Sequence, residues 1–110
     1  MTRIVEDSEL ERALDFLRDN AATIGEAKAR MVKAGHMIKH IEAILFLASE
    51  QKTVDAKKAD VRISERWIDA TNEEAEAAGE YERLRGLREA AALKIGAWQT
   101  ESANYRTMKI

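Results

Sequence analysis

The chain has 110 residues, which corresponds to one domain or less, and it contains no proline and no cysteine. Charged residues make up 35% of the chain, above the roughly 25% usual in globular domains, and only 5% are aromatic. The lack of cysteine excludes disulfides, thiolate metal sites and a cysteine nucleophile. The lack of proline favours long, uninterrupted helices.

Neither the N-terminal residues nor the most apolar stretch of the chain predicts contact with a membrane. The N-terminal residues are polar and acidic, without the apolar run of a secretory signal. The most apolar stretch, residues 41–48, is far too short to span a bilayer. We therefore expect a cytoplasmic protein with no membrane contact.

Opposite charges are segregated along the chain, although the formal net charge is only −2. Residues 27–41 hold four basic residues and no acid, whereas residues 73–82 hold five glutamates and no base. Residues 1–26 are acidic overall, and residues 83–110 are basic overall. Such blocks predict either helices that pair through complementary charge or a face that binds a polyanion.

The first half of the chain predicts two helices. A capping box that begins at Ser8 precedes an apolar face of leucine and alanine, which predicts a helix over residues 8–20. A second capping box begins at Thr23 and precedes a long apolar stripe spaced by three and four residues. This stripe predicts a helix over residues 24–49.

The second half of the chain predicts two more helices. The apolar pattern weakens around residues 49–53, where we favour a break or kink over a continuous helix. A third helix is predicted over residues 53–69, and a third capping box at Thr71 starts the last helix, over residues 72–105. No segment alternates with period two, so no strand is predicted.

None of these apolar stripes is wide enough to bury itself alone. We therefore predict an all-α fold: an antiparallel helical hairpin or three-to-four-helix bundle with long, coiled-coil-like helices, in a single domain over residues 1–110. A homodimer would complete the thin core. The side chains expected in the core or the oligomer interface are Ile38, Ile41, Leu45, Leu84, Leu87, Ile95 and Trp98.

The acid-free residues 27–41 carry the candidate binding surface. Basic side chains there cover an arc opposite the apolar stripe, and such a face can track a phosphate backbone. The preferred alternative is that this face pairs with the protein's own acidic helices. The aromatic side chains that would stack on single-stranded bases are missing from this segment. The candidate residues for binding a nucleic acid or a partner are Lys28, Arg30, Lys33, His36, Lys39 and His40, with Arg85, Arg88 and Arg106 in the last helix.

His36 and His40 lie four residues apart, the spacing of a zinc-binding pair on a helix. The glutamate of His-Glu-x-x-His is absent, and Lys33 and Lys39 would repel a cation, so two solvated histidines are the preferred interpretation. No metal or other cofactor is predicted. Without a glycine-rich phosphate loop or a Gly-x-Ser-x-Gly motif, no catalytic residue is assigned and no enzymatic activity is expected.

Two segments are distinctive: the run Ala27-Lys28-Ala29-Arg30 leading into Ile38-Lys39, and the ending at residues 92–106, with Trp98 and Arg106 as motif positions. In these segments the chain resembles a family of short helical proteins of tailed phages and prophages. The resemblance implies a place among the early proteins of recombination and replication, without enzymatic activity. It also implies the cytoplasm of a bacterial host.

The sequence therefore predicts a non-enzymatic accessory protein of phage DNA recombination or replication. It would bind DNA nonspecifically, or bind a DNA-processing protein, through the basic helix face. The alternative is a protein-binding adaptor or inhibitor of a host factor that has no contact with nucleic acid. A third hypothesis, a metal-dependent enzyme that uses His36 and His40, requires stoichiometric metal in the purified protein.

Overall fold

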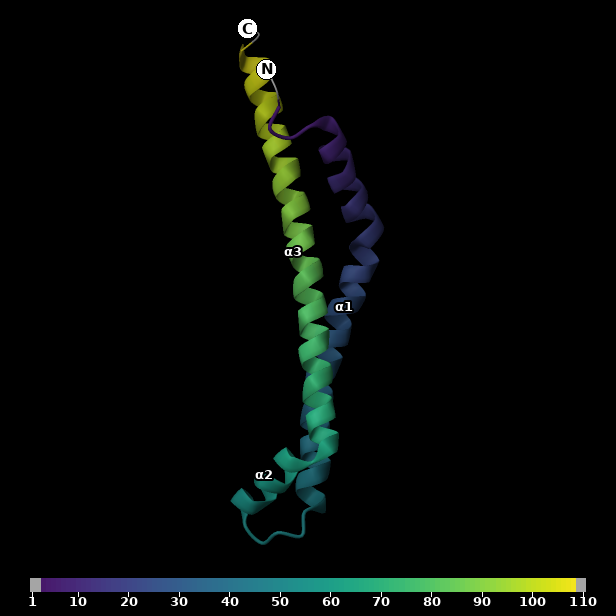
Figure 1. Cartoon of the computed structure of the whole chain (residues 1–110), viewed down its shortest axis with the longest axis vertical. Helices are drawn as coiled ribbons and strands as arrows, with labels where there is room; N and C mark the ends of the chain where they lie inside the picture. The colour runs from purple at the N-terminus through teal and green to yellow at the C-terminus, as the bar shows by residue number, and fades with distance from the viewer. Residues whose placement is uncertain (1–2, 109–110) are drawn as a thin grey trace. The chain divides into compact units, whose positions relative to one another are not determined.

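The computed structural model describes residues 3–108, and within that range the chain forms three helices and no strand (Figure 1). Helix α1 spans Asp7–Ala48, α2 spans Val54–Ile63 and α3 spans Glu65–Met108. The predicted all-α class is therefore confirmed. The two residues at each end of the predicted domain lie outside the described residues. No helix in the described range is both long and apolar enough to cross a membrane.

The chain divides into two compact units. Unit 1 combines Met1–Ile24 with Glu82–Ile110, and unit 2 consists of Gly25–Tyr81. In each unit a segment of α1 and a segment of α3 lie side by side and run in opposite directions (Figure 1). The predicted antiparallel hairpin is therefore confirmed, and the short α2 belongs to unit 2.

A heptad pattern determines which face of α1 is buried. Every seventh residue from Leu10 to Leu45 is Leu, Ile or Met, and every seventh residue from Ala13 to Ile41 is Ala, Asn or Ile. All of these side chains are buried or half-buried. Apolar residues that alternate at spacings of three and four form the seam of a coiled coil, and alanine in one of the two sets keeps that seam narrow.

Helix α3 supplies the matching face of the seam. Every seventh residue from Ala70 to Tyr105 is buried or half-buried, and these residues are Ala, Leu, Trp or Tyr. The second set, from Trp67 to Ser102, is more polar, and its member Arg88 is exposed. Of the side chains predicted for the core or an interface, Ile41 and Leu84 are buried, Leu87 is exposed, and the half-buried ones are Ile38, Leu45, Ile95 and Trp98.

The break predicted after residue 20 is wrong, because residues 8–20 and 24–49 belong to one helix, α1. The side chain of Asn20 donates a hydrogen bond to the carbonyl of Phe16, 3.0 Å away, and so stays within the helix. Thr23, the predicted cap, lies in the helix interior. The seam runs through this stretch, and its packing outweighs the local capping signals.

The break predicted at residues 49–53 is confirmed. Helix α1 ends at Ala48, and α2 begins at Val54 after the N-cap Thr53. The Thr53 hydroxyl accepts a hydrogen bond from the backbone N–H of Ala56 at 3.1 Å, which satisfies one of the free donors at the start of the helix.

The predicted helix over residues 53–69 and the predicted start at Thr71 are both wrong. Ser64 separates α2 from α3 with an extended backbone, φ −66° and ψ 128°. Its carbonyl then accepts hydrogen bonds from Trp67 and Ile68, both at 3.1 Å, so α3 begins at Glu65. The Thr71 hydroxyl donates to the Ile68 carbonyl at 2.8 Å, as a threonine inside a helix does, instead of capping a new helix.

Candidate functional site

The basic outer face of α1 lies in unit 2 and faces away from the seam. It consists of five exposed side chains: Lys28, Lys33, His36, Lys39 and His40. The heptad places His36 directly opposite the seam and Lys33, Lys39 and His40 next to His36, whereas Lys28 flanks the seam on the side opposite to Arg30. Since residues 27–41 form one uninterrupted helical segment without an acid, no carboxylate from the same stretch neutralises this face.

Arg30, which was predicted for the same surface, pairs with α3 instead. Its Nε and Nη2 donate to the two carboxylate oxygens of Glu73 at 2.8 and 3.0 Å, and Nη2 lies 4.0 Å from Glu76. The hydrogen bond from Arg30 lowers the pKa of Glu73, and the same bond raises the pKa of Arg30. The acidic residues 73–82 therefore do pair with the basic segment of α1, through Arg30.

The lysines of the basic outer face have no such partner. Among the described residues, Lys28, Lys33 and Lys39 form no hydrogen bond and no ion pair. Their ammonium groups are left to solvent or to a binding partner. The predicted alternative, in which the whole face is taken up by the protein's own acids, therefore describes Arg30 but not the three lysines.

Apolar side chains are also exposed along this part of α1. Val32 and Met37 are 45% and 42% exposed, and Leu47 near the end of the helix is 83% exposed. Residues 27–45 contain no aromatic residue.

The two histidines of the face lie one helical turn apart and are both exposed. Within residues 3–108, no group of three or more His, Asp or Glu side chains is placed to hold a metal ion. The structure adds no third ligand to His36 and His40.

The three arginines predicted in the last helix all belong to unit 1, so the nine predicted binding residues fall into two groups. Arg85 forms ion pairs along its own helix with Glu82 at 3.3 Å and Glu89 at 3.2 Å. Arg88 is exposed at a seam position, and Arg106 is exposed near the end of α3.

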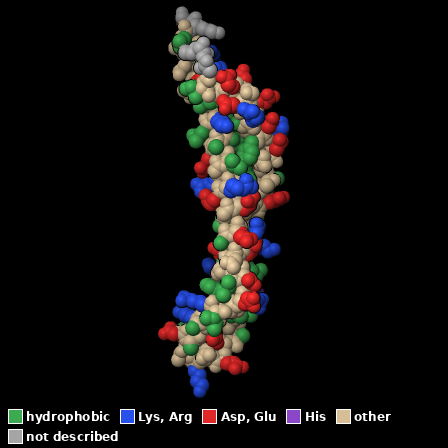
Figure 2. Space-filling view, in the orientation of Figure 1, with side chains coloured by type: hydrophobic (Ala, Val, Ile, Leu, Met, Phe, Trp, Pro, Cys, Tyr) green, Lys and Arg blue, Asp and Glu red, His purple; other side chains and the backbone are tan. Residues whose placement is uncertain are grey.

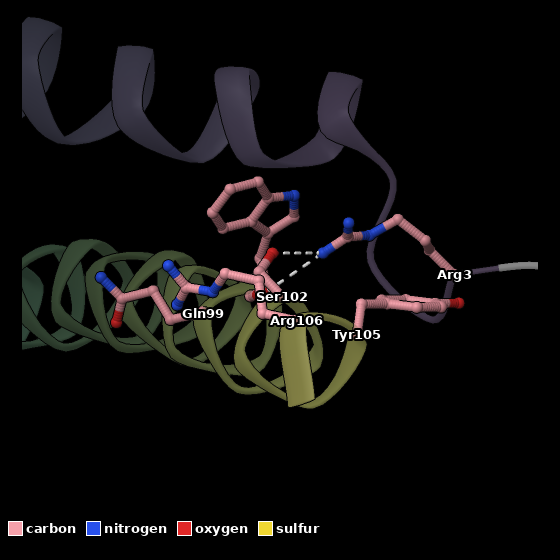
Figure 3. A pocket seen from close by; sticks show the side chains of 6 residues that line it. Arg3, Gln99, Ser102, Tyr105 and Arg106 are labelled. Atoms are coloured by element: carbon pink, nitrogen blue, oxygen red, sulfur yellow. Dashed lines mark hydrogen bonds between the residues drawn. The ribbon is translucent and has the colours of Figure 1, made fainter. Parts of the chain in front are cut away.

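A cluster around Arg3 in unit 1 was not predicted. The guanidinium of Arg3 extends from the N-terminal segment towards α3 (Figure 3), where Nη2 donates to the Trp98 carbonyl at 3.3 Å and to the Ser102 hydroxyl at 2.7 Å. It also lies 5.0 Å from the centre of the Trp98 ring and 5.4 Å from that of Tyr105, within cation–π range. Arg3 therefore holds the N-terminal segment against α3.

The N-terminal strap, residues 3–6, has further anchors on the same helix. The carboxylate of Glu101 accepts the backbone N–H groups of Val5 at 2.9 Å and Ile4 at 3.0 Å, and these two bonds lower the pKa of Glu101. Directly after the strap, the Trp98 indole N–H donates to Asp7, the first residue of α1, at 2.9 Å. The strap thus closes unit 1 at the end of the hairpin.

An open cavity of about 350 Å³ lies beside the strap, with Arg106 and Gln99 among the residues that line it (Figure 3). Arg106 was predicted as a motif position with Trp98, and both lie here. The sequence signal for Arg3 is weak: it is the only basic residue before Arg12 in an acidic N-terminal region. Contacts across more than ninety positions leave no local pattern to detect.

No match was found between this chain and any family model, curated protein or solved structure. The likeness to tailed-phage proteins thus stays a prediction from residues 27–39 and 92–106. Exposure, charge and pairing of the described side chains are the remaining basis for assigning a function.

Proposed function

We propose that this chain is a non-enzymatic binding protein that contacts the phosphate backbone of double-stranded DNA through the basic outer face of α1. The observation that carries this proposal is the exposure of Lys28, Lys33 and Lys39 without an intramolecular partner among the described residues, beside an Arg30 that pairs with Glu73. Lysines that neutralise phosphates release condensed counterions, and this release favours binding to nucleic acid even for a protein whose net charge is −2.

The spacing of the lysines suits a duplex. From Lys28 to Lys39 the helix rises about 16 Å at 1.5 Å per residue. Along the axis of a duplex, where each strand carries one phosphate per about 3.4 Å, that length corresponds to about five phosphates of one strand. Lysine presents a point charge without the bidentate geometry that reads bases, so the binding would be independent of sequence.

A duplex is favoured over a single strand because residues 27–45 contain no Phe, Tyr or Trp, whose large rings are the usual stacking platforms. Proteins that bind single strands stack successive bases on aromatic rings, and each stack contributes about 1–3 kcal/mol. The basic outer face supplies charge without such a platform. Because the chain resembles early proteins of tailed phages, we propose that this binding serves DNA recombination or replication in the cytoplasm of a bacterial host.

A second candidate function is that of an adaptor or inhibitor that binds an acidic surface of another protein. The exposed apolar side chains of Val32, Met37 and Leu47 favour it, because protein interfaces combine an apolar centre with a charged rim. The two candidates differ in their response to salt. Phosphate binding weakens steeply as salt rises, whereas an interface with an apolar centre retains more of its affinity.

Fluorescence anisotropy with a labelled DNA duplex at about 50 mM salt distinguishes the DNA-binding function from the adaptor function. Charge reversal of the three lysines of the face should weaken binding by at least about tenfold, because three phosphate contacts are replaced by repulsion. The matched control reverses three exposed basic residues of unit 2 that form no ion pair or hydrogen bond within the described range. The test variant is K28E/K33E/K39E, and the control variant is K52E/K58E/R66E.

Both variants change the net charge equally, so a general loss of attraction would weaken them alike. The proposal requires the test variant to bind much more weakly than the control. Equal weakening, or no binding by the wild-type chain at low salt, would contradict it. In that second case, capture of an acidic protein that depends on Val32 and Met37 would favour the adaptor.

A further inference from the structure

Unit 1 contains an apolar groove on one side of the seam, distinct from the basic outer face of α1. Phe16 on α1 and Leu87, Ala90 and Ala91 on α3 form its floor and walls, around a cavity of about 250 Å³. Phe16 is only half-buried, and Leu87 is 44% exposed. The groove therefore leaves its two largest apolar side chains partly in water.

The core beneath this groove is thin. Among the described residues, the buried apolar ones of unit 1 are Val5, Ala13, Ile24, Leu84 and Ala91, two of them alanines, and no large side chain within residues 3–108 is fully buried. Two paired helices bury little apolar surface by themselves, so hairpins of this kind gain stability by packing against further helices. The groove is the surface of unit 1 on which additional helices would do so.

The accessible surface of the chain can be compared with the area that a dimer contact covers. The chain exposes 8127 Å². A folded monomer of 12.4 kDa exposes about 6,100 Å² by the scaling of surface with mass. The excess is about 2,000 Å², whereas a standard protein interface covers about 800 Å² on each partner. The surface in excess of a compact monomer is therefore larger than one side of a standard interface.

The charges at the rim of the groove indicate what covers it. Arg12 and Lys94 are basic and Glu9 is acidic, so both signs occur around one apolar centre. In an interface with two-fold symmetry the same patch meets itself, and each acid can face a base of the other copy. A partner with charge of one sign, such as a nucleic acid, would meet repulsion at part of the rim. Figure 2 shows the same mixture of signs around exposed apolar side chains in unit 1.

We propose that this groove is the interface of a homodimer, in which Phe16 and Leu87 of each copy pack against the groove of the second copy. The dimer buries the apolar floor that a single hairpin leaves exposed. The interface lies in unit 1 and the basic outer face lies in unit 2, so the proposal does not depend on DNA binding.

Sedimentation equilibrium on the full chain tests the proposal. The wild-type chain should have twice its 12.4 kDa mass at micromolar concentrations. Leu87→Glu should sediment as a monomer, because the interface would bury two carboxylates in its apolar centre. Leu93→Glu is the matched control: Leu93 is 74% exposed on the same helix, outside the groove, and its variant should remain a dimer.

Milder variants keep the test decisive if Leu87→Glu unfolds, which far-ultraviolet circular dichroism would show. Leu87→Ala and Phe16→Ala should each raise the dimer dissociation constant by about tenfold or more, as truncation of a central interface side chain does. Leu93→Ala should leave it unchanged. A wild-type chain that stays monomeric at the highest soluble concentration overturns the proposal. So does a dimer that Leu93→Glu dissociates as readily as Leu87→Glu.

Discussion

Arg3 makes three kinds of contact with α3: a hydrogen bond to a backbone carbonyl, a hydrogen bond to the Ser102 hydroxyl, and cation–π contacts with Trp98 and Tyr105. A planar guanidinium can stack on a ring while its N–H groups donate sideways, which an ammonium group cannot do. The N-terminal strap therefore depends on arginine in particular at position 3.

Replacing Arg3 should destabilise the fold measurably. We expect Arg3→Ala to lower the free energy of unfolding by about 1–2 kcal/mol, from the loss of the cation–π contacts and the hydrogen bonds. Arg3→Lys should recover only part of that loss. Urea unfolding monitored by circular dichroism measures it. The control is Arg18→Ala, whose ion pairs with Asp15 and Asp19 are exposed to solvent, so that its replacement should change the free energy of unfolding much less. Equal effects of the two alanine variants would contradict the role given to Arg3.

The carboxylate of Glu101 should link stability to pH. The N–H groups of Val5 and Ile4 lower its pKa in the folded chain, so the carboxylate stabilises the fold fully above the ordinary glutamate pKa of about 4.3. This stabilisation is lost as the pH falls through the lowered value. Glu101→Gln should therefore be less stable than wild type at neutral pH, and the difference should shrink in acid.

Urea midpoints measured between about pH 7 and pH 3 check this expectation. Glu11→Gln is the control, because Glu11 is exposed and forms no hydrogen bond or ion pair within the described range. If Glu101→Gln and Glu11→Gln both run parallel to wild type across this range, the two backbone hydrogen bonds contribute no pH-dependent stability.

Periodicity predicted which side of α1 is basic, but not which base is neutralised. Arg30 and Lys33 are three residues apart in the same acid-free segment, yet only Arg30 reaches Glu73. The difference arises because Arg30 flanks the seam and Lys33 lies on the outer side of the helix. That distinction requires the position of the seam, and hence the register with α3.

At the scale of elements, the start of α2 depends on one side chain. Thr53 accepts the Ala56 N–H at the N-cap, so Thr53→Ala should lower the free energy of unfolding by about 1 kcal/mol. Thr100 provides the control, since its hydroxyl donates to the Gly96 carbonyl inside α3 and caps nothing. Thermal melts of both variants measure the effect, and Thr100→Ala should be neutral or slightly stabilising. A cap role for Thr53 is untenable if its alanine variant melts like wild type.

The helix boundaries show where local signals succeed and fail. The segment around residues 49–53 lacks apolar spacing, so its break was predictable. Asn20 and Thr71 look like boundaries in sequence, but both lie inside helices whose seams continue past them. Ser64 ends α2 without glycine or proline, and the local signal that it offers is the preference of serine for the position before a helix start.

At the scale of the whole molecule, the all-α class and the pairing of antiparallel helices followed from composition and spacing. The strap did not, because it joins residues 3–6 to Glu101 and Trp98 near the other end of the chain. The apolar groove of unit 1 was only partly foreseen. Leu87 was assigned to the core or an interface, and it lies outside the buried seam with 44% of its surface exposed.

The central claim is that the basic outer face of α1 contacts DNA phosphates, and the salt dependence of duplex binding tests it most directly. Each phosphate contact adds about 0.9 to the negative slope of the logarithm of affinity against the logarithm of salt concentration. Replacing Lys28, Lys33 and Lys39 with alanine should therefore make the slope shallower by about 2 to 3. Replacing Lys52, Lys58 and Arg66 with alanine should change it by less than about 1. Equal slopes for the two triple variants, or a wild-type chain that does not bind duplex DNA at low salt, would contradict the claim.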